Sequence, residues 1–407
     1  MTLIDEAYQR AVEVLEACMD KKGMKASAFA DGYPQVWARD SMITFLGASL
    51  IESDKFRECF RHSLLTLSRC QSDLGGIPTG VDTRRKELPK GGCGSMDNNP
   101  WYLIGHRVYQ MAYGDDSLLS ECRDNIQRAA LWLRYQDRNE DGLLECHEAG
   151  DWADLLANRH HVLYANALYG AALRCAAGSL EDNSGAGLLK RESERTVDML
   201  NLRLWIDNSD EQETRLRSLY GDWGMDFRSI RGVALKRDFY LPYVSFRDWG
   251  DYCDGLGNCL AILTGAADER RRHLILNYMH GAGMDLPYPI RVLDPPITEG
   301  SKDWREYYRN FNLNRPNQYH NGGIWPFIGG FYVAALVFDG RMEQAAMNLE
   351  KLAEANRLGS EPWAFNEWLH GLSGRPMGNR WQAWSAGMYV YAYHAVKEGK
   401  TPYFPLV

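Results

Sequence analysis

The sequence lacks long apolar runs, paired-cysteine motifs and basic tracts, and each absence argues against a class of protein. No stretch of about 18 consecutive apolar residues occurs, so we expect no membrane-spanning helix. The nine cysteines are scattered without a CxxC pair, which argues against a disulfide framework or a zinc site and favours reduced thiols in the cytoplasm. Because the net charge is −8 and no long run of Lys or Arg occurs, neither nucleic acid nor an anionic membrane is an expected partner.

Aromatic side chains, by contrast, are abundant. The chain of 407 residues contains 13 Trp and 22 Tyr, whose flat apolar faces and polar edges suit sugar rings as well as protein cores. The first ten residues, MTLIDEAYQR, are acidic and amphipathic and contain no apolar signal core, so we expect no secretion signal.

Twelve segments are predicted to be helices, and those apolar on all sides largely alternate with amphipathic ones. The buried segments are 36–51, 97–113, 162–175, 252–263, 322–338 and 382–397, and the amphipathic ones are 1–21, 54–70, 117–135, 181–205, 268–280 and 341–356. This alternation predicts an inner and an outer ring of helices, an all-α (α/α)6 barrel that forms a single domain over residues 1–407. The sequence has no repeat of fixed period, which disfavours an open helical solenoid.

The longest loops precede predicted inner helices. The stretches 71–96 and 281–318 are rich in Gly or Pro, and loops of that length are more often functional than idle. We expect them to gather on one face of the barrel. Residues 208–245 contain short apolar runs that predict a hairpin or an irregular excursion.

Polar and aromatic residues recur just before the predicted inner helices, so the barrel would bring them to one pocket. Carboxylates, Arg, amides and Trp faces together indicate a sugar site, where charged hydrogen bonds hold the hydroxyls and indole stacks on the ring. The predicted substrate-binding residues are Trp37, Arg39, Asp40, Asp97, Asn98, Trp101, Trp152, Arg159, His160, His161, Asp254, Tyr319, His320, Asn321, Trp325, Gln382 and Trp384.

Two carboxylates are the predicted catalytic pair. Asp154 follows Trp152 in a loop before a buried helix, where desolvation would raise its pKa and suit it to act as a general acid. The alternative is that Asp151 and Asp154 only cap that helix. Glu367, in a Gly-rich loop that we expect to be solvated, is the predicted general base, and the alternative is an ordinary surface acid. The adjacent His160 and His161 lack a metal-binding motif, so no metal or other cofactor is predicted.

Several stretches of the sequence resemble known families. VWARDSMITFLGASL resembles the start of the catalytic domain of amylo-α-1,6-glucosidases. YHNGGIWPF, CDGLGNCLAIL and NEWLHGLSGRPMGNRWQAWSAGMY resemble neutral/alkaline invertases. Both families are inverting (α/α)6 glycosidases, more distantly similar to glucosylglycerate and mannosylglycerate hydrolases and trehalases. The resemblance covers about 36–391. It implies that Asp154 is the acid, that Glu367 is the base, and that Arg39 and Asp40 hold the glucose.

The sequence also departs from these families. Invertases have an Asp-Arg-Arg-Met run at the acid where this chain has Asp154 followed by Leu-Leu-Ala, and the chain has no room for the transferase domain of a debranching enzyme. We therefore expect a small α-glucoside as substrate and partner, with sucrose or a glucosylglycerate- or mannosylglycerate-type substrate as the alternative. A sugar 2-epimerase that uses paired histidines and a non-catalytic sugar-binding protein are further alternatives. A homo-oligomer is left open.

Overall fold

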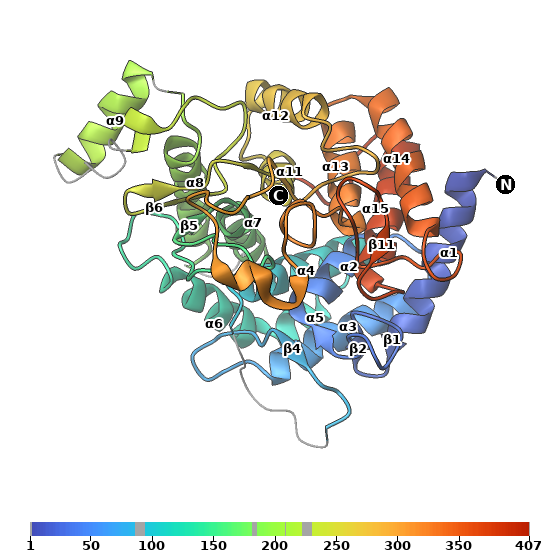
Figure 1. Ribbon diagram of the computed structural model, residues 1–407. Helices are drawn as coiled ribbons and strands as arrows, with labels where there is room; N and C mark the ends of the chain where they lie inside the picture. The colour runs from blue at the N-terminus through green and yellow to red at the C-terminus, as the bar shows by residue number, and fades with distance from the viewer. Residues whose placement is uncertain (1, 86–93, 181–184, 208, 222–229, 407) are drawn as a thin grey trace.

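A computed structural model describes residues 2–85, 94–180, 185–207, 209–221 and 230–406. Six helices form a closed inner ring, in which each packs against the next in chain order and the last returns to the first (Figure 1). They are α2 (Ala38–Ala48), α4 (Asn98–Tyr113), α7 (Leu163–Ser179), α11 (Gly255–Leu263), α13 (Pro326–Phe338) and α15 (Ala383–Glu398). The predicted all-α (α/α)6 fold is confirmed, while its organisation as one domain over 1–407 stays a prediction.

The inner helices are buried because they carry apolar or small residues on every side. In α13, PFIGGFYVAALVF, every residue except the last is buried. Two glycines close the ring, since a Cβ at Gly47 of α2 would collide with the carbonyl oxygen of Gly387 on α15. Gly at these positions therefore allows the first and last inner helices to touch through their backbones.

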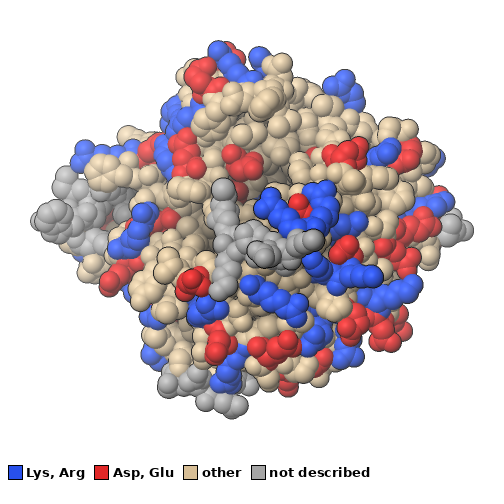
Figure 2. Space-filling model, turned by 90° about the horizontal axis from the view of Figure 1, so that it is seen from below, with Lys and Arg blue, Asp and Glu red and all other residues tan. Residues whose placement is uncertain are grey.

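An outer ring of amphipathic helices covers the inner one. These helices are α1 (Leu3–Cys18), α3 (Asp54–Arg69), α6 (Arg123–Arg134), α8 (Ala186–Arg203), α12 (Glu269–Gly281) and α14 (Met342–Arg357). Each packs its apolar stripe against inner helices, as α8 does on α7 and α14 on α13 and α15. None of the helices in the described ranges is long and apolar enough to cross a lipid bilayer. Acidic and basic side chains are interspersed over the face seen from below (Figure 2).

Short antiparallel ladders fix the chain where it enters inner helices. β3 (Val36–Trp37), β5 (His161–Val162) and β8 (Cys253–Asp254) each end where an inner helix begins. Their partners are strands from the long loops, namely β4 (Gly80–Val81), β6 (Tyr243–Ser245) and β9 (Leu293–Asp294), in the registers Val36↔Val81, Val162↔Tyr243 and Cys253↔Asp294. The remaining strands are β1 (Met19–Asp20), β2 (Gly23–Met24), β7 (Asp248–Trp249), β10 (Trp368–Leu369) and β11 (Pro376–Met377).

The structure modifies two expectations about the elements. The amphipathic segment 117–135 is broken at Cys122 into α5 (Ser117–Glu121) and α6, since the backbone at Cys122 leaves the helical region. The excursion at 208–245 holds α9 (Asp210–Tyr220), which projects from the ring (Figure 1), and leads into a β6–β7 hairpin. Part of this excursion, 222–229, lies outside the described residues.

The described parts of the two long loops meet the segment that carries Asp154. The Met96 N–H donates to the Gly150 carbonyl at 2.8 Å. From the second loop, Asn314 Nδ2 donates to the Leu155 carbonyl at 2.6 Å, and the Tyr308 hydroxyl accepts the Ala157 N–H. A short 3-10 helix, η2 (Glu306–Asn312), supplies that tyrosine. The two loops therefore share the face on which Asp154 lies, as expected, although residues 86–93 are not described.

Candidate active site

A pocket opens where the N-terminal ends of several inner helices meet. Twelve side chains line it, and all but Tyr33 are residues that the sequence predicts: Tyr33, Trp37, Arg39, Asp40, Trp152, Asp154, Tyr319, His320, Trp325, Glu367, Gln382 and Trp384. They come from segments that precede or begin α2, α7, α13 and α15. The pocket therefore depends on closure of the ring, because its members are far apart in sequence.

Aromatic rings form much of the pocket wall. The Trp152 ring meets His320 at 4.9 Å and Trp325 at 5.5 Å between centroids, both edge-on. Trp325 also lies 5.7 Å from Trp384, and its indole N–H donates to the Tyr319 carbonyl. Trp325 directly precedes Pro326, whose fixed φ suits the first position of α13. The result is a rigid apolar wall on which a sugar face can stack.

Arg39 and Asp40 lie in the first turn of α2, and Arg39 forms an ion pair with Asp97 outside the pocket. Arg39 Nη1 lies 3.0 Å from Asp97 Oδ2, and Arg39 Nε lies 3.6 Å from Asp40 Oδ2. Asp97 is fully buried and also accepts hydrogen bonds from the hydroxyls of Ser95 and Tyr164. Asp97 thus orients Arg39 and does not itself line the pocket.

Asp154 projects into the pocket from a tight turn. Asp151 Oδ1 accepts the Ala153 N–H at 2.7 Å, which fixes the backbone just before Asp154. The Asp154 side chain is 68% exposed, and His320 Nδ1, 3.8 Å away, is its nearest ionisable partner. Neither aspartate caps α7, because that helix begins at Leu163 with no side-chain cap. The capping alternative is therefore excluded.

Glu367 lies directly before β10 and is 5% exposed, so the expectation of a solvated loop is wrong for its side chain. Its carboxylate accepts two hydrogen bonds, from the Tyr33 hydroxyl at 3.2 Å and from the Asn379 N–H at 3.0 Å. Two donors stabilise the ionised form, which suits a group that must accept a proton. Glu367 is therefore a buried carboxylate that accepts two hydrogen bonds, and the alternative of an ordinary surface acid is excluded.

The pKa of each pocket carboxyl is raised. Desolvation raises the pKa of Glu367 to about 7, against the opposing hydrogen bonds from Asn379 and Tyr33. Desolvation likewise raises the pKa of Asp40 to about 6, although Arg39 opposes it. The pKa of Asp154 is also raised, mainly by desolvation and in part opposed by Arg39. Perturbed carboxyls gathered in one cleft are a common feature of catalytic sites.

The pocket gathers buried polar atoms that make no hydrogen bond within the described part of the chain. These atoms are Arg39 Nε, Asp40 Oδ2, His320 Nδ1, Gln382 Nε2 and Oε1, and Trp384 Nε1. A buried polar atom without a partner is costly, at about 1–3 kcal/mol each. Donors and acceptors therefore converge on one small space, as they would around a ligand with several hydroxyl groups.

Several predicted residues lie behind the pocket or away from it. Asn98 donates to the Thr79 hydroxyl and the Ile77 carbonyl, and the Trp101 indole donates to the Tyr164 hydroxyl, so both support the pocket from behind. Asp254 caps α11 by accepting the Leu256 N–H. Asn321 bonds to the backbone of Ile297 and so turns away from the pocket.

Arg159, His160 and His161 face a different part of the molecule. Arg159 pairs with Glu148 and Asp248. His161 Nε2 lies 3.3 Å from Asp141 Oδ2, and its Nδ1 lies 3.4 Å from Arg203. The structure does not bring these three residues to the pocket, and β5, which begins at His161, pairs with β6.

Among the described residues, one group has the composition of a metal site. The ligand atoms of Glu145, His160 and His161 lie within 4.8 Å of one another. The Arg203 guanidinium lies beside His161, and a fixed positive charge there disfavours a bound cation. This group lies outside the pocket.

Sequence reasoning missed Tyr33. Its hydroxyl reaches Glu367 across 334 positions of sequence. The residue stands in a loop before α2 whose composition carries no catalytic signal, so only its proximity to the Trp37–Asp40 stretch could have suggested it.

Comparison with known proteins gives a consistent result. A family model described as alkaline and neutral invertase matches residues 252–399. The chloroplastic alkaline/neutral invertase E of Arabidopsis thaliana is 27% identical over 335 residues, which are 75% of this chain and 52% of that protein. The chain spans about half the length of the curated relatives that it matches, some of which are named as chloroplastic and others as mitochondrial.

Solved structures share the fold at low sequence identity. Mannosylglycerate hydrolase from Thermus thermophilus, in complex with Tris and D-glycerate, aligns with a TM-score of 0.67 at 14% identity, over 94% of this chain and 99% of that one. A bacterial glucoamylase complexed with acarbose aligns with a TM-score of 0.66 at 15% identity, over 97% of this chain and 56% of that one. The chain therefore has the (α/α)6-barrel fold of glycoside hydrolases, and its sequence is similar to that of the alkaline and neutral invertases.

Proposed function

We propose that this protein is an inverting glycoside hydrolase that releases glucose from a small α-glucoside. The observation that carries the proposal is the convergence, in one aromatic pocket, of two unlike carboxyl groups and of buried polar atoms that make no hydrogen bond within the described residues. Arg39 and Asp40 would bind sugar hydroxyls, and the indole wall would pack against the ring. The similarity to invertases and the glycosidase fold support hydrolysis, and the α-glucoside is our own assignment.

In the proposed reaction, Asp154 and Glu367 move one proton each. Asp154 donates its proton to the glycosidic oxygen as the bond to the anomeric carbon breaks and the electron pair goes to that oxygen. Glu367 takes a proton from a water molecule whose oxygen attacks the same carbon from the opposite face. The hydrogen bonds on Glu367 favour the ionised form, whereas no hydrogen bond from another described residue opposes a proton on Asp154.

The 2-epimerase alternative loses support from the geometry. That chemistry needs two histidines as acid and base, and only His320 among the described histidines lines the pocket. The carboxyl pair would then have no role. We retain sucrose and glucosylglycerate- or mannosylglycerate-type substrates as the second candidates, because of the invertase similarity and the mannosylglycerate hydrolase fold match. For the compartment we keep the cytoplasm, because the eight described cysteines are all unpaired.

The test is a screen for hexose release from sucrose, trehalose, isomaltose, kojibiose, panose and glucosylglycerate. With the best substrate, Asp154→Asn and Glu367→Gln should each lower kcat by about 10²–10⁴-fold, since each removes one proton-transfer group. Bound glucose should remain detectable in both variants. If no compound releases hexose while sugar still binds, the protein is a sugar-binding protein; if both variants keep wild-type rates, the assigned pair is wrong.

A further inference from the structure

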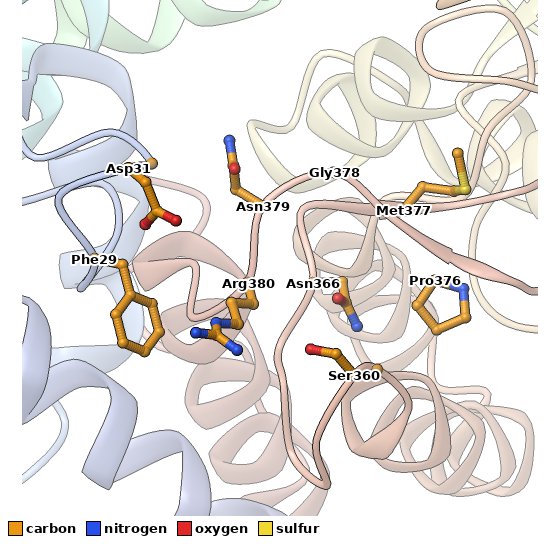
Figure 3. A pocket seen from close by; sticks show the side chains of 11 residues that line it. Phe29, Asp31, Ser360, Asn366, Pro376, Met377, Gly378, Asn379 and Arg380 are labelled. Carbon is orange, nitrogen blue, oxygen red and sulfur yellow. The ribbon is translucent and has the colours of Figure 1, made fainter.

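A second, larger cavity lies against the loop that holds Glu367. Its volume is about 460 Å³, within the range of about 300–1,000 Å³ that is usual for ligand sites. The lining side chains come from three separate segments, 29–32, 359–366 and 376–380, and include Phe29, Asp31, Ser360, Asn366, Asn379 and Arg380. In Figure 3, Arg380 lies between Phe29 on one side and Asn366 and Ser360 on the other, with Asp31 near Phe29.

Glycines fix the walls of this cavity. Gly378 has φ +69°, and a Cβ there would lie 2.5 Å from Glu367 Oε2 and 2.7 Å from the Trp368 ring. Gly359 has φ +151°, a conformation that other residues rarely adopt, and a Cβ there would collide with Ala364. Because the backbone turns are tightly packed against their surroundings, the cavity is formed in advance of any ligand.

The chemistry of the lining favours a neutral ligand with many hydroxyl groups. The Arg380 guanidinium lies 4.4 Å over the Phe29 ring and 3.4 Å from Glu361 Oε1, so its charge is balanced. The side chains of Asp31 and Ser360 are exposed to solvent and make no hydrogen bond or ion pair within the described ranges. A carboxylate, a hydroxyl and amide groups around a partly apolar floor provide donors and acceptors in the mixture that sugar hydroxyls need.

Two of the three segments that line the cavity contain, or lead directly into, the hydrogen-bond donors to Glu367, the proposed base. Asn379 donates its N–H to Glu367 Oε2, and the Glu367 N–H donates to the Asn379 carbonyl at 2.7 Å. Residues 29–32 lead directly into Tyr33, whose hydroxyl donates to Glu367 Oε1. A ligand that touches both segments therefore contacts the immediate neighbours of both donors to the Glu367 carboxylate. Its binding would hold those donors in place.

We propose that this cavity is a second site for a neutral mono- or disaccharide, and that its occupancy raises turnover by fixing the Tyr33 and Asn379 donors on Glu367. The binding part stands on the cavity alone, whereas the effect on turnover rests on the proposed function. Two linked sites respond to each other's ligands by a coupling that is typically about 5–150-fold. A substrate that also fits the second site should activate its own hydrolysis.

The experiment is a calorimetric titration of the full-length protein with glucose. Wild type should bind two glucose molecules, and Ser360→Trp, which places a ring in the cavity, should bind one. Ser218→Trp, on the exposed part of α9, is the matched control and should bind two. Asp31→Asn, an isosteric change at an exposed position, should weaken the second site by about tenfold because a charged hydrogen bond is lost.

Enzyme kinetics provide the second part of the experiment. Rate against concentration of the best substrate should curve upward for wild type and follow simple saturation for Ser360→Trp, with the same kcat/KM at low concentration. The proposal is overturned if wild type has no glucose site that is lost in Ser360→Trp, or if binding at such a site is the same in Asp31→Asn. Two-site binding with simple saturation in wild type would refute the coupling. Ser360-dependent binding without hydrolysis of any glucoside would refute the proposed function and leave the second site standing.

Discussion

The two carboxyl groups of the pocket differ in their hydrogen bonding. Glu367 accepts from a hydroxyl and a backbone N–H in a buried position, whereas the more exposed Asp154 accepts from neither kind of donor on any other described residue. Donors aimed at a carboxylate stabilise its ionised form, and the described residues supply such donors to Glu367 but not to Asp154. This contrast in hydrogen bonding fits the roles of base for Glu367 and acid for Asp154 that we propose.

Removing the Tyr33 hydroxyl should impair the base selectively. Glu367 must be ionised to act, so activity falls as the pH drops through its pKa of about 7. Tyr33→Phe removes a hydrogen bond to a charged group, worth about 1.5–3 kcal/mol, so the acidic limb of kcat/KM should move up by about 1–2 pH units. Tyr135→Phe, at an exposed tyrosine, is the control and should leave the profile unchanged. An unchanged limb in Tyr33→Phe would show that this bond does not act on the base.

At the scale of elements, the turn between β11 and α15 positions the base through Gly378. Gly378→Ala should lower kcat by about 10²-fold or more, because the new Cβ would lie 2.5 Å from Glu367 Oε2 and displace it. Gly399→Ala is a matched control, since Gly399 has φ +65° and an added Cβ there would meet nothing within 4 Å. Both variants should lose about 1–2 kcal/mol of stability from left-handed backbone strain, and Gly378→Ala should lose more because its Cβ also collides with Glu367 and Trp368. Equal activities in the two variants, measured beside their thermal unfolding, would contradict the role of Gly378.

The helices were predictable, whereas individual side-chain directions were not. Helices buried on all sides are recognisable by continuous apolar composition, and this placed Arg39, Trp325 and Trp384 correctly at inner-helix starts. His160 and His161 also precede an inner helix but do not line the pocket, and β5, which contains His161, pairs with β6 from the 208–245 excursion. That pairing is a long-range contact, which local pattern cannot indicate.

Over the whole molecule, buried carboxyls and histidines make stability depend on pH. Desolvation raises the pKa of Asp151 to about 8 and that of Glu367 to about 7, from 3.8 and 4.5. The folded state therefore holds protons that the unfolded state has released, so this contribution to stability is lost as the pH rises through those values. Desolvation lowers the pKa of buried His106 to about 3. Its contribution makes stability rise with pH, but only below the usual histidine pKa of 6.5.

The net expectation is that the free energy of unfolding falls between pH 6.5 and 8, by roughly 2 kcal/mol on the linkage relation. Chemical denaturation of wild type and of Asp151→Asn at several pH values in this window measures it. The variant should show a flatter dependence, because the asparagine amide does not ionise. Stability that rises over this range, or an equally steep loss in the variant, would contradict the assignment of buried protonated carboxyls.

The central claim, that Asp154 and Glu367 act as an acid and a water-activating base, is tested most directly by the anomer released first. With an α-glucoside identified in the screen, NMR should detect β-glucose before mutarotation sets in, because the water activated by Glu367 attacks opposite the leaving group. With α-glucosyl fluoride, whose departure needs no protonation, Asp154→Asn should keep its activity and Glu367→Gln should lose it. α-Glucose as the first product would contradict the claim, because retention of configuration requires a covalent intermediate and would make Glu367 a nucleophile.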